Sequence, residues 1–306
     1  MKKVQFGKTD MCVSRIALGG YPFAGVNRAQ GWNPYSAEGR KEAMHTINTA
    51  LDMGINYIDT APVYGEGHSE SIIGDVMAYH RDRCYLATKA PWTCKEDINK
   101  SFEASLKRLK TDYVDVLQLH GGCFTAEEQQ HILKGGPLEA LQELKQKGLV
   151  RYIGLTVEEP WTSVPLIKNG AFDVIQVCYN LTRQSAGYHL LDETKANGMA
   201  VCAMRPLTSG MFQRQLEYLA PQWLENGEVF RICLAFILSD SRVHMAHVGM
   251  RWSSEVEQNV KFVNDFEPTY DIADTPRLTQ KIYETEDEKL YLNNQNLTEG
   301  YIEGDL

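Results

Sequence analysis

The sequence lacks the features of a membrane-bound, secreted or nucleic-acid-binding protein. No stretch approaches the roughly 18 consecutive apolar residues of a membrane span, and the first residues, MKKVQFGKTD, lack the apolar run of a secretory signal. Basic residues are in the minority, since 31 Lys and Arg stand against 40 Asp and Glu and the formal net charge is −9. Nucleic acids and anionic membranes select basic surfaces, so we expect neither as a partner.

Cysteine is sparse and follows no recognisable pattern. The seven cysteines are dispersed along the chain, odd in number and without a C-x-x-C pair. Such usage predicts reduced thiols in a cytoplasmic protein rather than a disulfide framework. It also offers no ligand set for zinc or an iron–sulfur cluster, so we expect no metal.

Short β-rich runs alternate with helix-length segments through most of the 306 residues. The runs that read as strands lie at 14–20, 56–60, 84–89, 114–120, 150–156, 173–180, 199–206 and 243–250. Between them, apolar residues recur at a spacing of about 3.6, for example in 39–54, 69–80, 95–110 and 136–148. Gly54 and Gly148 stand where two of these helices are expected to end.

This alternation is an α/β pattern, and it predicts a (β/α)8 TIM barrel. A doubly wound open sheet is the competitor, but LGGYPFAG, after the first run, lacks the G-x-G-x-x-G spacing of its phosphate-binding turn. From about residue 262 the chain becomes strongly acidic and loses strand signals. We therefore expect a barrel domain over 1–265 and an acidic C-terminal extension over 266–306, with a helix or two packed on the barrel.

Ionisable residues end three successive runs. Asp59, Lys89 and His120 stand at these ends, and Tyr64 follows Asp59 in the loop DTAPVYGEG. The carboxyl ends of parallel barrel strands share one face, so the four side chains are expected to converge. A purely structural protein has little reason to place an ionisable group at each of these ends.

The four groups have a coherent combined chemistry. A tyrosine hydroxyl, with a pKa of about 10, is a weak proton donor at neutral pH. Lys89 would stabilise the phenolate of Tyr64 and lower that pKa, while Asp59 would hold Lys89 charged and aimed. His120 would orient a carbonyl oxygen or relay a proton. Together they would protonate an alkoxide as it forms from a carbonyl, and the hydride must then come from a nicotinamide cofactor.

The segments around these residues resemble the aldo-keto reductase superfamily. Three blocks carry the resemblance, GINYIDTAPVYGEGHSESIIG (54–74), LATKAPW (86–92) and DYVDVLQLHG (112–121), and it runs in order from about residue 4 to residue 265. The resemblance implies a catalytic tetrad of Asp59, Tyr64, Lys89 and His120, with Tyr64 as the general acid/base. Two members also have structural interpretations, because Asp59 can cap a helix and His120 can be a satisfied interior histidine.

The resemblance also implies a cofactor site, with departures from the family pattern. Thr156 and Val157 replace a Ser-Asn pair that holds the nicotinamide amide, whereas Gln176 matches the third anchor. Met204 stands where the family often stacks an aromatic ring, and Arg205 after it would contact phosphate or a substrate anion, or form a surface salt bridge. The implied cofactor-binding residues are Thr156, Gln176, Met204, Arg205, Pro206, Leu207, Gly249, Met250, Arg251, Glu255, Gln258 and Asn259.

The choice between the two dinucleotides depends on VGMRWSSEVEQNV (248–260), which resembles the family's adenosine-phosphate segment. Ser253 and Ser254 are expected to cap a helix whose free N–H groups face phosphate. Arg251 can bind the 2′-phosphate of NADP(H), whereas a carboxylate such as Glu255 is how dinucleotide folds recognise a free ribose hydroxyl. The family pattern places NADP(H) ahead of NAD(H).

Tyr21, Trp32 and Trp92 lie in loops expected at the mouth of the site. Aromatic walls suit an aldehyde, a ketone or a sugar face, although Trp32 can equally pack its own loop. The leading function is an NAD(P)-dependent aldo-keto reductase, acting as a carbonyl reductase or an alcohol or aldose dehydrogenase on a small molecule. Two alternatives stay open, a cofactor-binding regulatory subunit and a lyase or isomerase that uses the cofactor transiently. Assembly into a homo-oligomer also stays open.

Overall fold

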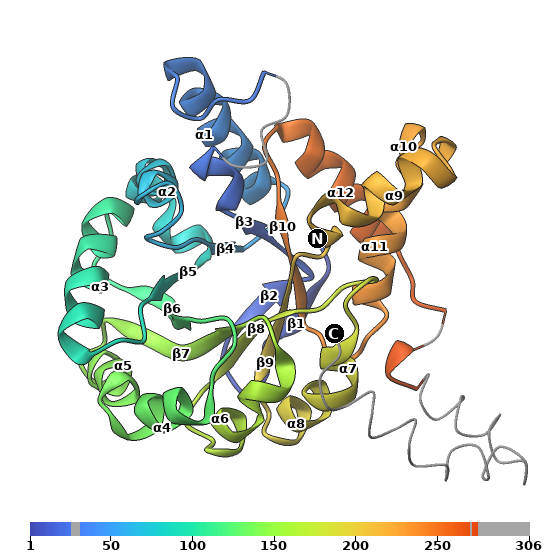
Figure 1. Ribbon diagram of the computed structural model, residues 1–306. Helices are drawn as coiled ribbons and strands as arrows, with labels where there is room; N and C mark the ends of the chain where they lie inside the picture. Colours follow the sequence, from blue (N-terminus) through green and yellow to red (C-terminus); the bar gives the residue numbers. More distant parts are fainter. Residues whose placement is uncertain (26–30, 270, 275–306) are drawn as a thin grey trace, which may run out of the picture.

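The computed structural model describes residues 1–25, 31–269 and 271–274 (Figure 1). Within them, parallel strands close into a barrel in which the last strand pairs with the first. In barrel order the strands are β3 (Ile16–Gly19), β4 (Tyr57–Asp59), β5 (Tyr85–Ala90), β6 (Val114–His120), β7 (Val150–Val157), β8 (Val174–Cys178), β9 (Ala200–Met204) and β10 (Met245–Gly249). The predicted (β/α)8 barrel is confirmed. Residues 275–306, most of the expected acidic extension, lie outside the described residues.

Helices surround the strands as an outer ring (Figure 1). They are α1 (Ala37–Asp52), α2 (His68–His80), α3 (Lys95–Leu109), α4 (Ala126–Lys134), α5 (Pro137–Gln146), α6 (Val164–Lys168), α7 (Ser185–His189), α8 (Leu191–Ala196), α9 (Met211–Leu219), α10 (Gln222–Glu225), α11 (Glu228–Leu238) and α12 (Ser253–Asp265). Of the expected C-terminal extension, the structure describes a short 3-10 helix at Ile272–Asp274.

Local sequence explains where several helices begin and end. The Ser36 hydroxyl accepts a hydrogen bond from the Gly39 N–H at 3.0 Å and caps α1. Gly54 and Gly148 follow α1 and α5 with φ of +88° and +74°, in the left-handed region that glycine adopts without strain. Both helix ends therefore lie where the glycines predicted them.

A short hairpin that the sequence did not predict closes the amino-terminal end of the barrel. It consists of β1 (Lys3–Gln5) and β2 (Cys12–Ser14), which pair antiparallel. Phe6, Met11 and Val13 of this hairpin are fully buried and pack in one cluster with the lower barrel interior, including Tyr57 and Met245. Because these apolar groups fill the bottom of the barrel, polar chemistry is confined to its middle and upper layers.

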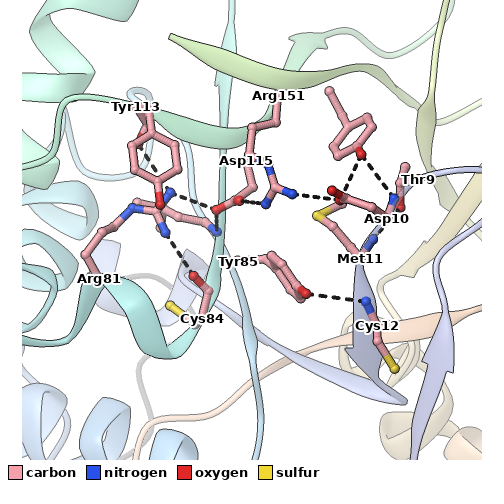
Figure 2. Close-up of polar contacts among 12 residues, drawn as sticks. Thr9, Asp10, Met11, Cys12, Arg81, Cys84, Tyr85, Tyr113, Asp115 and Arg151 are labelled. Carbon is pink, nitrogen blue, oxygen red and sulfur yellow. Dashed lines mark hydrogen bonds and ion pairs between the residues drawn. The ribbon is translucent and has the colours of Figure 1, made fainter. Parts of the chain in front are cut away.

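Ion pairs hold the hairpin against the strands, as Figure 2 shows. Asp115, at the start of β6, is 1 % exposed. Its carboxylate accepts from Arg81 at 2.7 Å, from Arg151 at 2.6 Å and from the Leu86 N–H at 2.8 Å. Arg151 also donates to Asp10 of the hairpin turn at 2.7 Å. One guanidinium therefore ties the hairpin to a buried strand carboxylate.

Polar side chains occupy the barrel interior above this plug. Successive residues of a strand face opposite sides, and the register sets Lys89 level with Gln118, His120 with Thr156, and Thr156 with Gln176. The buried polar residues on these inward positions are Asp59, Lys89, Gln118, Thr156, Gln176 and His247. Such a polar interior is costly unless its groups are paired, and the pairs they form define the site.

Candidate active site

Lys89 is the centre of the site and has no exposed surface. Its ammonium donates to Asp59 Oδ2 at 2.7 Å and to the Thr60 carbonyl at 2.8 Å. The Tyr64 hydroxyl lies 3.4 Å from Lys89 Nζ. The structure thus brings together three of the four predicted tetrad residues in a single hydrogen-bonded chain.

The loop that carries Tyr64 is a sequence of tight turns. Gly65 and Gly67 have φ of +62° and +90°. A Cβ on Gly65 would lie 2.5 Å from the Tyr35 hydroxyl, and one on Gly67 would lie 2.5 Å from the Arg108 side chain. Glycine at both positions therefore lets the loop pack closely against its neighbours, which holds the Tyr64 ring in place.

His120 completes the group at the carboxyl end of β6. Its ring is edge-on to Tyr64, with centroids 6.0 Å apart and an interplanar angle of 83°. Burial, reinforced by the positive charge of Lys89, lowers the pKa of His120 to about 4. The imidazole is therefore neutral at physiological pH, and it can orient an oxygen by a hydrogen bond but does not carry a charge there.

The charges of the site follow from burial and pairing. Burial raises the pKa of the Asp59 carboxyl, but Lys89 and the hydrogen bonds outweigh burial and hold that pKa well below its usual range. Burial likewise opposes the charge of Lys89, yet Asp59 and Tyr64 together raise its pKa. Asp59 and Lys89 are therefore an ion pair.

The pKa of Tyr64 corrects one expectation. Lys89 does act to lower it, as the sequence suggested, but desolvation of the buried phenol is the larger effect and the pKa is raised overall. The sequence could not reveal this outcome, because it depends on how deeply the loop buries the ring. Tyr64 is therefore a protonated hydroxyl at neutral pH.

Gln118 is a site residue that the sequence reasoning missed. Its side-chain amide donates to Asp59 Oδ1 and to Gln176 Oε1, both at 3.1 Å. The Thr156 hydroxyl lies 3.5 Å from its carbonyl oxygen. Gln118 therefore links the ion pair to two of the predicted cofactor anchors. Its position two residues before His120, on the same face of β6, was the signal available.

The predicted nicotinamide anchors lie on three neighbouring strands. Thr156, Gln176 and Met204 come from β7, β8 and β9, and Gln176 Nε2 is 3.9 Å from Met204 Sδ. Val157 is fully buried in the apolar layer between strands and helices. Its side chain therefore packs the barrel, and the position offers no side-chain hydrogen bond.

Arg205 forms the salt bridge that was one of its two sequence interpretations. Its guanidinium donates to Glu158 Oε1 at 2.6 Å, and Glu158 also pairs with Arg183. The backbone of Arg205 has φ of +56°, and its carbonyl accepts from the Asn180 side chain at 3.0 Å. After it, Pro206 is buried and Leu207 is partly buried. The carboxyl-end loops of β7, β8 and β9 are thus joined by this network.

The start of α12 differs from the prediction. Ser253 is its first helical residue and Trp252 occupies the N-cap position, so neither Ser253 nor Ser254 is the N-cap, and the Trp252 side chain makes no capping bond. Instead, Glu255 accepts from the Arg251 backbone N–H at 2.6 Å and from its guanidinium at 3.0 Å. Arg251 and Glu255, the two residues expected to discriminate between NADP(H) and NAD(H), are therefore paired with each other.

The remaining predicted cofactor residues lie around this helix start. Gly249 ends β10 and is exposed, whereas Met250 after it is buried. Gln258 is exposed and Asn259 partly exposed on α12. They share one corner of the carboxyl-end face, between β10 and α12.

The three aromatic residues predicted at the mouth have different environments. Tyr21 is 46 % exposed and lies edge-on to Tyr64, with centroids 5.1 Å apart. Trp92 is partly buried against Phe124. Trp32 is 3 % exposed, and its indole N–H donates to the Pro22 carbonyl at 3.0 Å. Trp32 therefore packs its own loop, the alternative interpretation of that residue.

Two absences apply to the part of the chain that the structure describes. There, no three His, Cys, Asp or Glu side chains are grouped so that they could hold a metal ion. Among the same residues, none of the helices has the length and apolarity needed to cross a membrane.

The fold agrees with comparisons to known proteins. The aldo/keto reductase family model matches residues 15–281, and this chain belongs to that family. Membership supports NAD(P)-dependent oxidoreduction. Two crystal structures of an aldo/keto reductase from Klebsiella pneumoniae, in complex with NADP and acetate or with NADPH, superpose with TM-scores of 0.72 and 0.73 at 25 % and 24 % identity, covering 90 % of this chain and 95 % and 94 % of theirs.

Curated relatives are similar at a comparable level. L-galactose dehydrogenase of Arabidopsis thaliana is 28 % identical over 299 residues, covering 85 % of this chain and 88 % of the plant protein. The NADH-specific methylglyoxal reductase of Escherichia coli is 30 % identical over 236 residues, covering 69 % of each. One of these names describes a sugar dehydrogenase and the other a reductase of a small aldehyde.

Proposed function

We propose that this protein interconverts a carbonyl and an alcohol with a nicotinamide cofactor, and that Tyr64 is the general acid/base. The observation that supports this proposal is the chain from Asp59 through Lys89 to the Tyr64 hydroxyl, with spacings of 2.7 and 3.4 Å. A phenol held beside a buried, paired ammonium can give up its proton and have the resulting phenolate stabilised. A fully structural ion pair would not need this third member.

In the reducing direction, a bound nicotinamide supplies the hydride that no side chain can provide. Tyr64 donates its proton to the carbonyl oxygen, and Lys89 stabilises the phenolate that remains. His120, neutral because its pKa is about 4, hydrogen-bonds the same oxygen and orients it. In the oxidising direction Tyr64 must first lose its proton, so oxidation accelerates with rising pH because the pKa of Tyr64 is raised.

The chain's own groups suit such a cofactor. Thr156 and Gln176 lie level with each other on the adjacent strands β7 and β8, and both offer side-chain hydrogen bonds. The N-cap residue of α12, Trp252, makes no side-chain cap, and the N–H groups of Ser253 and Ser254 at the helix start can donate to a phosphate oxygen. Gly249 leaves the backbone accessible beside that helix. We assign the amide of the nicotinamide to the first pair and a phosphate to α12.

The Arg251–Glu255 pair moves our cofactor assignment from NADP(H) to NAD(H). Glu255 already binds the Arg251 guanidinium at 3.0 Å. A 2′-phosphate would compete with that carboxylate and be repelled by it, whereas ribose hydroxyls can donate to it. The family pattern alone favoured NADP(H), and the pairing is what supports the change.

The substrate we propose is a small polar aldehyde or a sugar, oxidised or reduced at its carbonyl carbon. Tyr21 presents a half-exposed ring beside Tyr64, which suits stacking on a sugar face. The relatives named for L-galactose and methylglyoxal lie within this class. The complete tetrad favours an enzyme over a regulatory subunit.

The test is a fluorescence titration of the purified protein with NADH and NADPH, followed by a screen of aldoses and short aldehydes. We expect tighter binding of NADH and consumption of one cofactor per product. Turnover of a sugar without net cofactor consumption would support the lyase or isomerase instead. Cofactor binding with no turnover across the screen would support the regulatory subunit.

A further inference from the structure

His247 is a buried titratable residue that the proposed mechanism does not use. It lies in the middle of β10, level with Ala17 of β3, and is 6 % exposed. Its Nδ1 is 3.7 Å from Asp59 Oδ2. Among the described residues, neither ring nitrogen has a partner within hydrogen-bond distance. A leucine or methionine would fill this inward position without burying two polar atoms, so the imidazole calls for an explanation.

The surroundings of His247 contain few charges. Tyr57 packs against the ring from below, with centroids 5.5 Å apart, and its hydroxyl is also buried without a described partner. Burial raises the pKa of Tyr57 and of Cys202 well above their usual ranges, so both are uncharged. On the side of the tetrad, the charged groups are Asp59 and, beyond it, Lys89. The charged group nearest to His247 among these is therefore Asp59, and its main electrostatic interaction is with that carboxylate.

The two oxygens of Asp59 are unequally engaged. Oδ1 accepts from Gln118, while Oδ2 accepts from Lys89 and is the oxygen that His247 Nδ1 faces. An N–H on Nδ1 would therefore compete with the ammonium for the same oxygen. Because this neighbour is a carboxylate, we assign the imidazole proton to Nδ1.

We propose that His247 is a positioning residue that acts through Asp59 and Lys89 to set the pKa of Tyr64; this inference rests on the proposed role of Tyr64. An N–H on Nδ1, 3.7 Å from Oδ2, draws the negative charge of the carboxylate away from Lys89. The ammonium is then less neutralised by Asp59 and stabilises the Tyr64 phenolate more strongly.

The experiment compares three variants, His247→Leu, His247→Asn and His247→Gln. Asparagine places an amide N–H near the position of Nδ1, whereas glutamine places it near Nε2. The first readout is the ionisation of Tyr64, measured by phenolate absorbance as the difference between each variant with and without Tyr64→Phe. The second is the pH profile of kcat for alcohol oxidation, with KM and NADH affinity measured alongside.

We expect His247→Leu to raise the pKa of Tyr64 by about one unit, which lowers oxidation about tenfold at a fixed pH below that pKa. His247→Asn should keep the profile of the unmodified protein, and His247→Gln should shift it as leucine does. KM and NADH affinity should change by less than about twofold, because His247 lies beneath the site rather than at its mouth.

Superimposable pH profiles for all three variants would overturn the inference, as would an equal loss of rate in all three without a shift, which marks a packing residue. If the leucine variant does not fold, the comparison of asparagine with glutamine decides. The absorbance readout does not require turnover. A protein that turns over no substrate but shifts its Tyr64 ionisation would contradict the proposed function and retain the inference.

Discussion

Each end of the barrel buries an aspartate that pairs with basic side chains, but the two aspartates have different surroundings. At the amino-terminal end, both oxygens of Asp115 accept hydrogen bonds from Arg81, Arg151 and a backbone N–H, and Arg151 joins them to Asp10 of the hairpin turn. At the carboxyl end, Asp59 is buried as well, but its partner Lys89 also contacts the Tyr64 hydroxyl. The Tyr64 ring in turn lies beside the half-exposed ring of Tyr21. A buried ion pair becomes a candidate for catalysis when its chain of polar groups leads toward solvent.

The largest expected difference between the two ends is in kcat, when one tyrosine hydroxyl is removed at each end. Tyr64→Phe should lower kcat by roughly 10²–10⁴-fold, because the proton donor is lost, with cofactor affinity nearly unchanged. Tyr152→Phe is the matched control, since its hydroxyl donates to Asp10 at the opposite end, at 2.8 Å. Steady-state kinetics on both variants checks this, and equal turnover in Tyr64→Phe would remove Tyr64 from the mechanism.

Replacing the amino-terminal carboxylate, Asp115, should have the opposite result and lower stability while leaving kcat unchanged. Asp115→Ala leaves two arginines and a buried N–H without their acceptor, and should lower the free energy of unfolding by about 3 kcal/mol. The folded fraction should keep its kcat, because no tetrad residue contacts Asp115 in the described structure. Urea unfolding monitored by circular dichroism, with kinetics below the transition, gives both numbers. A large loss of kcat in the folded protein would contradict the division between the ends.

Each end also carries a histidine whose pKa is about 4, His120 at the carboxyl end and His244 near the hairpin. Burial is the main cause for both, and His244 Nδ1 additionally accepts the Val201 N–H at 3.1 Å. The unfolded chain, with a histidine pKa of about 6.5, binds more protons below that pH. The contribution of the two neutral histidines to the free energy of unfolding is therefore fully present above about pH 6.5. It is lost as the pH falls toward 4, by about 2 kcal/mol for each partly exposed ring.

The check is the free energy of unfolding between pH 7 and pH 4 for single replacements by glutamine. His244→Gln should flatten the pH dependence without changing kcat, because only the amino-terminal end is altered. His120→Gln should flatten it as well but also lower kcat. Unchanged acid sensitivity in both variants would show that neither histidine is held neutral by the fold.

The smallest effect concerns an ion pair that is only partly buried. The side chains of Arg251 and Glu255 are each 26 % exposed, whereas the side chain of Asp115 is 2 % exposed. Glu255→Gln should therefore change the free energy of unfolding by less than about 1 kcal/mol. It should nevertheless tighten NADPH binding about tenfold relative to NADH, because the carboxylate that repels a 2′-phosphate is removed. Fluorescence titration with both dinucleotides measures the ratio, and an unchanged ratio would place the ribose elsewhere.

Much of the fold could be predicted because its signals are local. Gly54 and Gly148 ended two helices as expected, since a left-handed residue after a helix is a property of a few consecutive residues. The hairpin before β3 was missed, because its strands have three residues each and owe their stability to the barrel interior that they plug. The predicted serine cap of α12 was wrong for a related reason. The helix begins at Ser253, so Trp252 holds the N-cap position, and the Glu255 carboxylate accepts the Arg251 N–H.

The barrel and the convergence of Asp59, Lys89, Tyr64 and His120 could be predicted from the residues alone, because parallel strands in a closed barrel must bring their carboxyl ends to one face. The balance of their pKa values could not, since desolvation depends on every neighbour in the folded protein that excludes water. The tertiary structure alone also decided that Trp32 packs inward, that Gln118 joins the two halves of the site, and that His247 lies 3.7 Å from Asp59. Such contacts join residues far apart in the chain, and periodicity carries no information about them.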